Sequence, residues 1–176
     1  MLIGLYTPTA AQYLPYNSES PKVAALLGEM IVTANPNLKI EHIGSTAVPG
    51  CWGKGIIDLL VMYGSGCIES ARDCLDTVGF QRQGGPEPFP EWRPMRVGGI
   101  EYLGRGYRIH AHVIEHGRAD AIALLKFRDL LRQDSQLQRA YEAHKRAILA
   151  RGLTKSNEYS KAKGDFIQRA LTYYEL

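Results

Sequence analysis

Residues 41–46 read Glu-His-Ile-Gly-Ser-Thr, and after Pro49-Gly50 the chain passes through Lys54 into Ile56-Ile57-Asp58-Leu59-Leu60-Val61. The run from Ile56 to Val61 is apolar and rich in β-branched residues, which predicts a buried strand. An aspartate inside such a strand is costly unless it is paired, hydrogen-bonded or bound to a cation. The pattern therefore places the Asp58 carboxylate where it needs a partner.

The turn before this strand has the composition of a phosphate-binding loop. Gly44 allows the backbone to approach a phosphate closely, and the neighbouring N–H groups and the Ser45 hydroxyl can donate hydrogen bonds. Thr46 and Lys54 add a second hydroxyl and a cation. We therefore predict that Gly44, Ser45, Thr46 and Lys54 bind phosphate. The alternative is a tight structural loop beside a hydrogen-bonded aspartate.

The Gly-Ser turn followed by an aspartate on the next strand resembles the signature of the nucleotidyltransferase superfamily, and residues 41–61 resemble its GrpB branch. Positions that also resemble GrpB proteins include Phe127-Arg128-Asp129-Leu130-Leu131-Arg132, Tyr141, Lys145, Tyr159, Lys163, Phe166 and Ile167. This resemblance implies a nucleoside triphosphate (NTP) as substrate and magnesium bound by Asp58. The superfamily's Asp-x-Asp pair is broken here, because Leu60 stands two residues after Asp58.

Composition narrows the class of protein. The chain has 176 residues, of which 45% are hydrophobic and 22% charged, and a formal net charge of +3. We expect one domain over residues 1–176, with a core at about 20–117 and C-terminal helices at about 118–174. The modest charge argues against polymeric nucleic acid as a partner. The chain shows no membrane span and no signal peptide, so we expect a cytoplasmic protein that binds a nucleotide and a small-molecule acceptor.

Periodicity predicts alternating helices and strands, followed by helices alone. The expected helices are 20–34, 68–78, 119–132, 135–150 and 156–174, and the expected strands are 38–43, 55–63, 95–103 and 107–114. Ser20 is expected to cap the first helix, with Pro21 in its first turn. Together these elements predict an α/β (α+β) fold with a nucleotidyltransferase-like small mixed sheet flanked by helices and a helical C-terminal part.

His110-Ala111-His112 is the second chemical motif. Residues i and i+2 of a strand point to the same face, so Arg108, His110 and His112 are expected to line one side of the sheet. The GrpB resemblance places His112 near the position of a third metal ligand. Imidazole binds zinc, manganese or nickel well and magnesium poorly, and it can also act as a base. A purely structural histidine pair is the alternative.

Two further patterns were weighed. Arg93, Arg96, Arg105 and Arg108 are close enough in sequence to clamp a polyphosphate. Tyr159 and Lys163 match the Tyr-x-x-x-Lys pair of short-chain dehydrogenases, but residues 1–40 contain no dinucleotide-binding glycine fingerprint. We interpret that pair as helix packing.

The sequence therefore predicts metal-assisted transfer of a nucleotidyl group from an NTP to an unknown acceptor. Asp58 and His112 are the predicted catalytic and metal-binding residues, and Arg108 joins the predicted phosphate contacts. A module of the same fold that binds a nucleotide, coenzyme or anion without catalysis is the alternative hypothesis.

Overall fold

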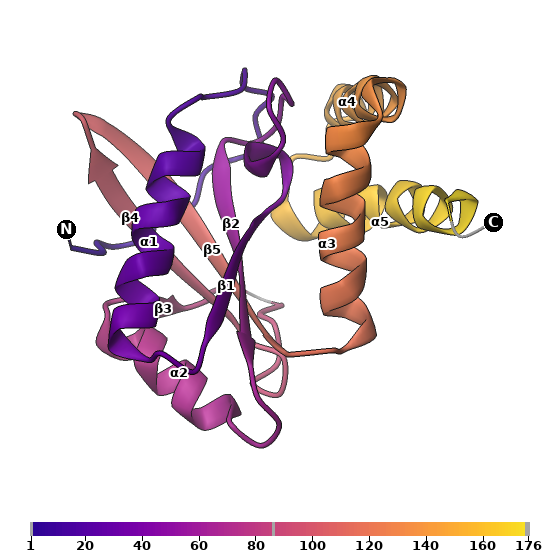
Figure 1. Cartoon of the computed structure of the whole chain (residues 1–176). Coiled ribbons are helices and arrows are strands. Elements are labelled where there is room, and N and C mark those ends of the chain that lie inside the picture. Colours follow the sequence, from indigo (N-terminus) through magenta and orange to yellow (C-terminus); the bar gives the residue numbers. More distant parts are fainter. Residues whose placement is uncertain (1, 86, 175–176) are drawn as a thin grey trace.

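The computed structural model describes residues 2–85 and 87–174. Its helices are α1 (Ser20–Ala34), α2 (Ile68–Thr77), α3 (Ala119–Gln133), α4 (Ser135–Ala150) and α5 (Ser156–Tyr173), with a short 3₁₀ turn, η1 (Ser45–Ala47). Its strands are β1 (Lys39–Ile43), β2 (Ile56–Tyr63), β3 (Gln81–Arg82), β4 (Met95–Tyr102) and β5 (Arg105–Glu115). The mixed α/β architecture predicted from the sequence is confirmed (Figure 1).

The five strands form one mixed sheet in the order β1-β2-β5-β4-β3. Strands β2 and β5 are parallel, and the other neighbouring pairs are antiparallel. The parallel register pairs Asp58 with His110 and Leu60 with His112. Since register partners point to the same side of a sheet, these four side chains share one face.

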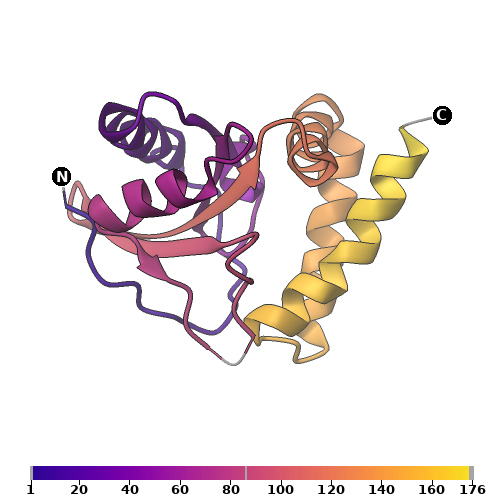
Figure 2. The same cartoon turned by 90° about the horizontal axis from the view of Figure 1, so that it is seen from below.

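Helices α1 and α2 cover the opposite face, which we call the packed face (Figure 2). Alternate residues of β2 point to it, and Ile57, Leu59 and Val61 are all 0% exposed. They pack with Leu27 of α1 and with Leu75 of α2. The alternation that places Asp58 on one side of the sheet therefore places the main core on the other.

Several segments of the chain cover the face that carries Asp58, which we call the site face. Helix α3 packs Leu124 and Leu125 over Leu60 and Met62. The N-terminal segment joins the edge of β4, where Gly4 forms a β-bridge with Gly99, and then crosses the site face, where Tyr6 reaches His110 (Figure 2). None of the helices in the described part of the chain combines the length and hydropathy that a membrane crossing requires.

Two local predictions were wrong. Ser20 is the first helical residue of α1, and Glu19 occupies the N-cap position without a side-chain capping hydrogen bond. Asn17 takes over part of this role, because its Oδ1 accepts from the Glu19 N–H at 3.0 Å. Strand β3 was also missed, because two residues are too few to show an alternating pattern.

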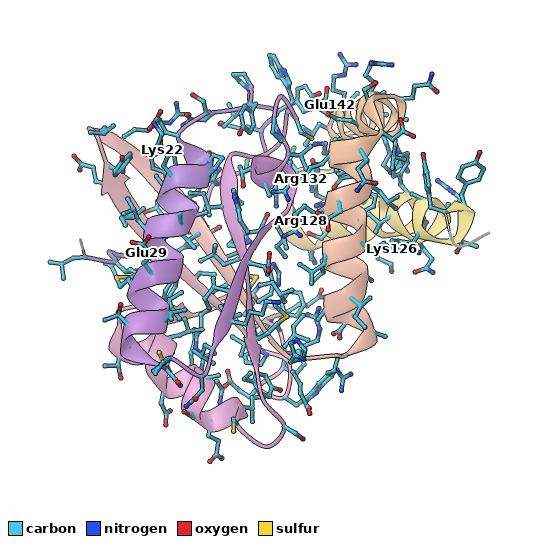
Figure 3. All side chains as sticks on the ribbon, in the orientation of Figure 1. Lys22, Glu29, Lys126, Arg128, Arg132 and Glu142 are labelled. Carbon is cyan, nitrogen blue, oxygen red and sulfur yellow. The ribbon has the colours of Figure 1, made fainter. Side chains whose placement is uncertain are left out.

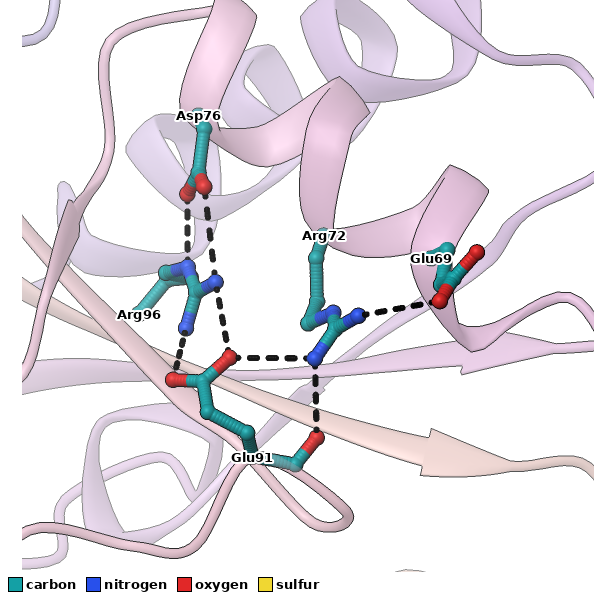
Figure 4. A network of polar contacts seen from close by, with 5 residues as sticks. All are labelled: Glu69, Arg72, Asp76, Glu91 and Arg96. Carbon is teal, nitrogen blue, oxygen red and sulfur yellow. Dashed lines mark hydrogen bonds and ion pairs between the residues drawn. The ribbon is translucent and has the colours of Figure 1, made fainter.

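A polar network on the packed face anchors the connection between β3 and β4 (Figure 4). Arg96 is only 1% exposed and forms ion pairs with Asp76 of α2 at 2.6 Å and with Glu91 of this connection at 3.3 Å. Arg72 of α2 also binds Glu91, at 3.2 Å. The network fastens the connection to α2, so Arg96 is not part of a phosphate clamp.

Candidate functional site

Asp58, His110 and His112 converge on the site face, as strand alternation predicts. Oδ1 of Asp58 lies 3.5 Å from Nδ1 of His110 and 3.7 Å from Nε2 of His112. One donor atom from each of the three residues lies within 4.8 Å of the other two, which makes them a candidate cation site. His110, which the sequence analysis did not nominate as a ligand, is therefore as close to Asp58 as His112 is.

The surroundings orient these side chains. The Tyr6 hydroxyl lies 2.9 Å from Nε2 of His110. The Phe89 ring packs edge-on against the His112 ring, with 5.8 Å between the ring centres. Burial alone would raise the pKa of Asp58, but hydrogen bonds and charge from His110 and His112 outweigh it and hold that pKa well below its ordinary value. Asp58 is therefore an anion at neutral pH, ready to bind a cation.

The Gly44-Ser45 turn lies directly against Asp58. Gly44 has φ +73°, a left-handed conformation, and a Cβ at this position would overlap Oδ2 of Asp58. Gly53 is similarly constrained, because a Cβ there would overlap Oγ of Ser45 and lie 3.6 Å from Nζ of Lys145. Two glycines thus allow the turn, the carboxylate and a lysine to approach one another closely.

Thr46 and Arg108 occupy less accessible positions in the same region. The buried Thr46 hydroxyl donates to the carbonyl of Ile56 at 3.0 Å. Arg108 donates to the carbonyl of Lys54 at 2.9 Å and also to the hydroxyl of Thr9. A cavity of about 100 Å³ beside the turn is lined in part by Ser45, Thr46 and Arg108. Arg108 thus fastens the N-terminal segment and the Lys54 loop beside this cavity.

Three lysines from three segments gather beside Asp58. Lys54 precedes β2, Lys145 lies on α4 and Lys163 lies on α5. The ammonium groups of Lys54 and Lys163 both lie 5.1 Å from the centre of the Tyr159 ring. The ammonium group of Lys145 lies 4.4 Å from the centre of the Tyr141 ring and donates to the carbonyl of Trp52. We call these three residues the lysine cluster.

The three ammonium groups of the lysine cluster outnumber the carboxylates that act on them, which are Asp58 for Lys54 and Lys163 and Glu142 for Lys145. Within residues 2–85 and 87–174, none of the three forms an ion pair with a carboxylate. Burial, together with the charges of Lys54 and Lys145 and against the opposing charge of Asp58, lowers the pKa of Lys163 to about 8. Burial also lowers the pKa values of Lys54 and Lys145. Cations held together in this way favour an anionic ligand.

Sequence reasoning missed Lys145 and Lys163 as ligand candidates. A signal was present, because Tyr141 and Lys145 have the same i, i+4 spacing as Tyr159 and Lys163. This spacing places each ammonium group over a tyrosine ring of its own helix. The Tyr159 and Lys163 pair was interpreted as packing, and the Lys163 ammonium group does pack over the Tyr159 ring, while its position in the lysine cluster also makes it a candidate ligand.

Other charged residues near the Gly44-Ser45 turn form ion pairs and hydrogen bonds within the protein. Arg128 of α3 donates to Glu41 at 2.9 Å and to the carbonyl of His42 at 3.1 Å, and Arg132 donates to the carbonyl of Ala47 at 3.0 Å (Figure 3). Arg93 pairs with Asp120 of α3 at 2.6 Å. These contacts fix α3 against the turn and leave Glu41 unavailable as a second metal ligand.

The donor set does not fit a magnesium pair. Magnesium prefers octahedral oxygen ligands, and a pair of ions needs more than one carboxylate. At the position two residues after Asp58, Leu60 is 0% exposed and packs among Ile43, Met62 and Ile114. The site face is therefore polar at Asp58 and apolar one step further along β2.

Comparison with known proteins shows relatives that are similar to this chain in sequence. The chain is 36% identical over 134 residues to the UPF0157 protein SCO7215 of Streptomyces coelicolor, covering 74% of this chain and 66% of the relative. It is 35% identical over 162 residues to the UPF0157 protein PA4798 of Pseudomonas aeruginosa, covering 91% of this chain and 66% of that relative. The chain thus spans just under two thirds of the length of these relatives.

Solved structures share the fold. A crystal structure of the conserved protein GrpB from Enterococcus faecalis matches with a TM-score of 0.68 and 21% identity, covering 94% of this chain and all of that one. The Cid1 poly(U) polymerase bound to MgATP matches with a TM-score of 0.56 and 12% identity, covering 81% of this chain and 46% of Cid1. The model of the GrpB protein family matches residues 11–172. The chain therefore belongs to the GrpB family and has a nucleotidyltransferase-like fold.

Proposed function

We propose that this protein binds a nucleoside triphosphate and transfers its nucleotidyl group to a small-molecule acceptor. One observation carries the proposal: three lysines from separate parts of the chain converge beside the Gly44-Ser45 turn and Asp58, and none of them forms an ion pair with a carboxylate among the residues that the structure describes. Burying ammonium groups together is unfavourable, and an anion that enters among them removes that cost. A triphosphate supplies enough negative charge to meet all three.

Each part of the site has a role in such a complex. The turn at Gly44 and Ser45 offers donors to phosphate oxygens, and so do the ammonium groups of Lys54 and Lys163. An acceptor hydroxyl or amine attacks the α-phosphorus, the bond to the bridging oxygen breaks, and the acceptor's proton leaves to water. The lysine cluster stabilises the pyrophosphate that departs. In this proposal Asp58 and His112 would hold a cation that neutralises charge on the reacting phosphate.

The setting of the reaction belongs to the same proposal. Cid1 has been solved with MgATP and with MgGTP, and the fold it shares with this chain is what supports a nucleotide here. The net charge of +3 supports a small acceptor over polymeric nucleic acid. The free thiols of Cys51, Cys67 and Cys74 suit the reducing cytoplasm, where we place the protein.

Calorimetry tests binding. ATP, GTP, CTP and UTP are titrated into the protein with a divalent ion and again with chelator. Lys163→Ala and Asp58→Asn should each weaken the best ligand by about tenfold to a hundredfold, the usual effect of losing one charge-assisted contact. Lys161→Ala is the matched control, because it removes the same charge from an exposed position of α5.

The second candidate, an anion-binding module without catalysis, is favoured by Leu60 in place of a second carboxylate. A pyrophosphate-release assay with a panel of hydroxyl and amine acceptors separates the two. Release that depends on Asp58 supports the transferase. Binding that survives Asp58→Asn and chelation, but is lost with Lys163→Ala, supports the module. Failure to bind any triphosphate contradicts both.

A further inference from the structure

The spacing of the Asp58, His110 and His112 donor atoms indicates which coordination geometry they suit. A tetrahedral ion with bonds of about 2.0–2.1 Å holds neighbouring donors about 3.3–3.4 Å apart, whereas an octahedral ion with such bonds holds them about 2.9 Å apart. The separations of 3.5 and 3.7 Å measured from Oδ1 of Asp58 are nearer to the tetrahedral value, and the donors of the two histidines lie within 4.8 Å of each other. Small side-chain adjustments would bring all three atoms onto one ion.

Tyr6 orients His110 for this role. Its hydroxyl lies 2.9 Å from Nε2 of His110, on the far side of the ring from Nδ1, the atom nearest Asp58. When the hydroxyl accepts the Nε2–H, the lone pair of Nδ1 is directed toward Asp58. Metal-binding histidines commonly use such an outer partner to fix the tautomer and the ring orientation.

His112 presents to Asp58 the ring nitrogen that His110 turns away, which is Nε2. Its Nε2 faces Asp58, while its Nδ1 is enclosed and has no hydrogen-bond partner in the described ranges of the chain. The Phe89 ring contacts the His112 ring edge-on at 5.8 Å. Because both histidines and Asp58 lie on paired strands and not on loops, the three donors are preorganised.

The chemistry of the donors selects the class of ion. One carboxylate with two imidazoles suits zinc, cobalt or nickel, whereas magnesium prefers oxygen ligands alone. We propose that Asp58, His110 and His112 bind one divalent transition-metal ion of the zinc class, with at least one coordination position open to a phosphate oxygen. This inference deepens the proposed function. Only the identity of the incoming ligand, a phosphate oxygen, rests on that function.

Cobalt(II) is the probe, because its visible absorption reports coordination geometry directly. Full-length protein without an affinity tag is stripped with chelator and titrated with cobalt(II) in the absence of nucleotide. We expect one equivalent to bind with the intense visible bands of a tetrahedral site. Zinc should displace the cobalt, and a large excess of magnesium should not.

Variants assign the ligands. His112→Gln and Asp58→Asn should each abolish the visible bands, and Tyr6→Phe should weaken cobalt binding by about tenfold through loss of the outer hydrogen bond. His116→Gln is the control, because His116 is exposed beyond the end of β5. Unchanged thermal unfolding of the Tyr6→Phe variant shows that its effect arises at the site and not from misfolding.

The experiment distinguishes this inference from the function on which it builds. Displacement of cobalt by magnesium, absence of stoichiometric uptake, or wild-type bands in His112→Gln would overturn the metal assignment. Triphosphate binding without cobalt binding refutes the metal site and leaves the proposed function standing. Cobalt binding without triphosphate binding supports the metal site and contradicts the proposed function.

Discussion

The two faces of the sheet follow opposite rules although they share the same strands. On the packed face Ile57, Leu59 and Val61 are all 0% exposed beneath α1 and α2. On the site face Asp58 retains 26% exposure of its side chain and faces two histidines. Alternate residues of β2 thus serve stability on one side and binding on the other, so substitutions one position apart should differ in kind.

The site face is itself divided along the strand. Asp58 lies beside the turn, where the N-terminal segment and the lysine cluster surround it. Leu60 lies one step along under α3, with Met62 and Leu124. Leu60 therefore occupies, under α3, the position where the second carboxylate of an Asp-x-Asp pair would stand.

The largest expected effect comes from restoring that carboxylate. Leu60→Asp places an unpaired charge in an apolar cluster and should destabilise the protein by about 4 kcal/mol or more. Urea unfolding followed by circular dichroism measures the loss, with Asp58→Asn as the polar control on the same face. A stable Leu60→Asp variant that binds two metal ions would show that α3 does not set the boundary.

On the packed face, Leu59→Ala should cost about 3 kcal/mol, because it removes a fully enclosed side chain and leaves a cavity. Its affinity for triphosphate should stay within twofold of the wild type, since Leu59 points away from Asp58. Urea unfolding and calorimetry on the same preparation check both statements. A loss of affinity comparable to that of Lys163→Ala would mean that the two faces are coupled.

Arg96 is the polar exception on the packed face. Arg96→Leu should cost about 1–2 kcal/mol, because it removes the ion pairs with Asp76 and Glu91, while both carboxylates are near enough to solvent to be rehydrated. Triphosphate binding should not change. If affinity falls instead, Arg96 acts on the site through the connection that carries Phe89, which limited proteolysis of that connection would show.

Much of this division could be predicted from the sequence. The apolar run of β2 with one aspartate and the His-x-His alternation of β5 are local patterns, and the sheet preserves both. Contacts between distant segments left no such pattern. Tyr6 reaches His110 across 104 residues, and Lys54 reaches Tyr159 only when α5 folds back against the Lys54 loop.

The errors have the same physical origin. Arg93, Arg96 and Arg108 are neighbours in sequence, but Arg93 binds α3, Arg96 binds α2 and Arg108 binds the N-terminal segment. Their separation follows from strand direction and from the acidic residues that the helices present. Clustering along the chain therefore does not show which charged side chains meet in the fold, and the lysine cluster forms only in three dimensions.

The smallest expected effect, and the one specific to the lysine cluster, is its dependence on pH. Lys163 has a pKa of about 8 in the folded protein, below its ordinary value of 10.5. Triphosphate affinity should therefore fall as the pH rises above 8, by up to tenfold per pH unit for a single proton. Below pH 8 binding should be nearly independent of this group. Calorimetry between pH 7 and 9.5 measures the profile.

Stability should change in the opposite direction. Between pH 8 and 10.5 the unfolded chain binds more protons at Lys163 than the folded protein does, so the free energy of unfolding should rise with pH. Because Lys163 is partly exposed, solvent screening should limit this gain to about 1 kcal/mol. Lys163→Met should abolish both trends, stabilising the protein at pH 7 while weakening triphosphate binding, and Lys161→Met should retain both. Lys163 lies among Lys54, Lys145 and Asp58. If affinity and stability both fall as the pH rises, a group other than Lys163 controls the pH dependence of the site.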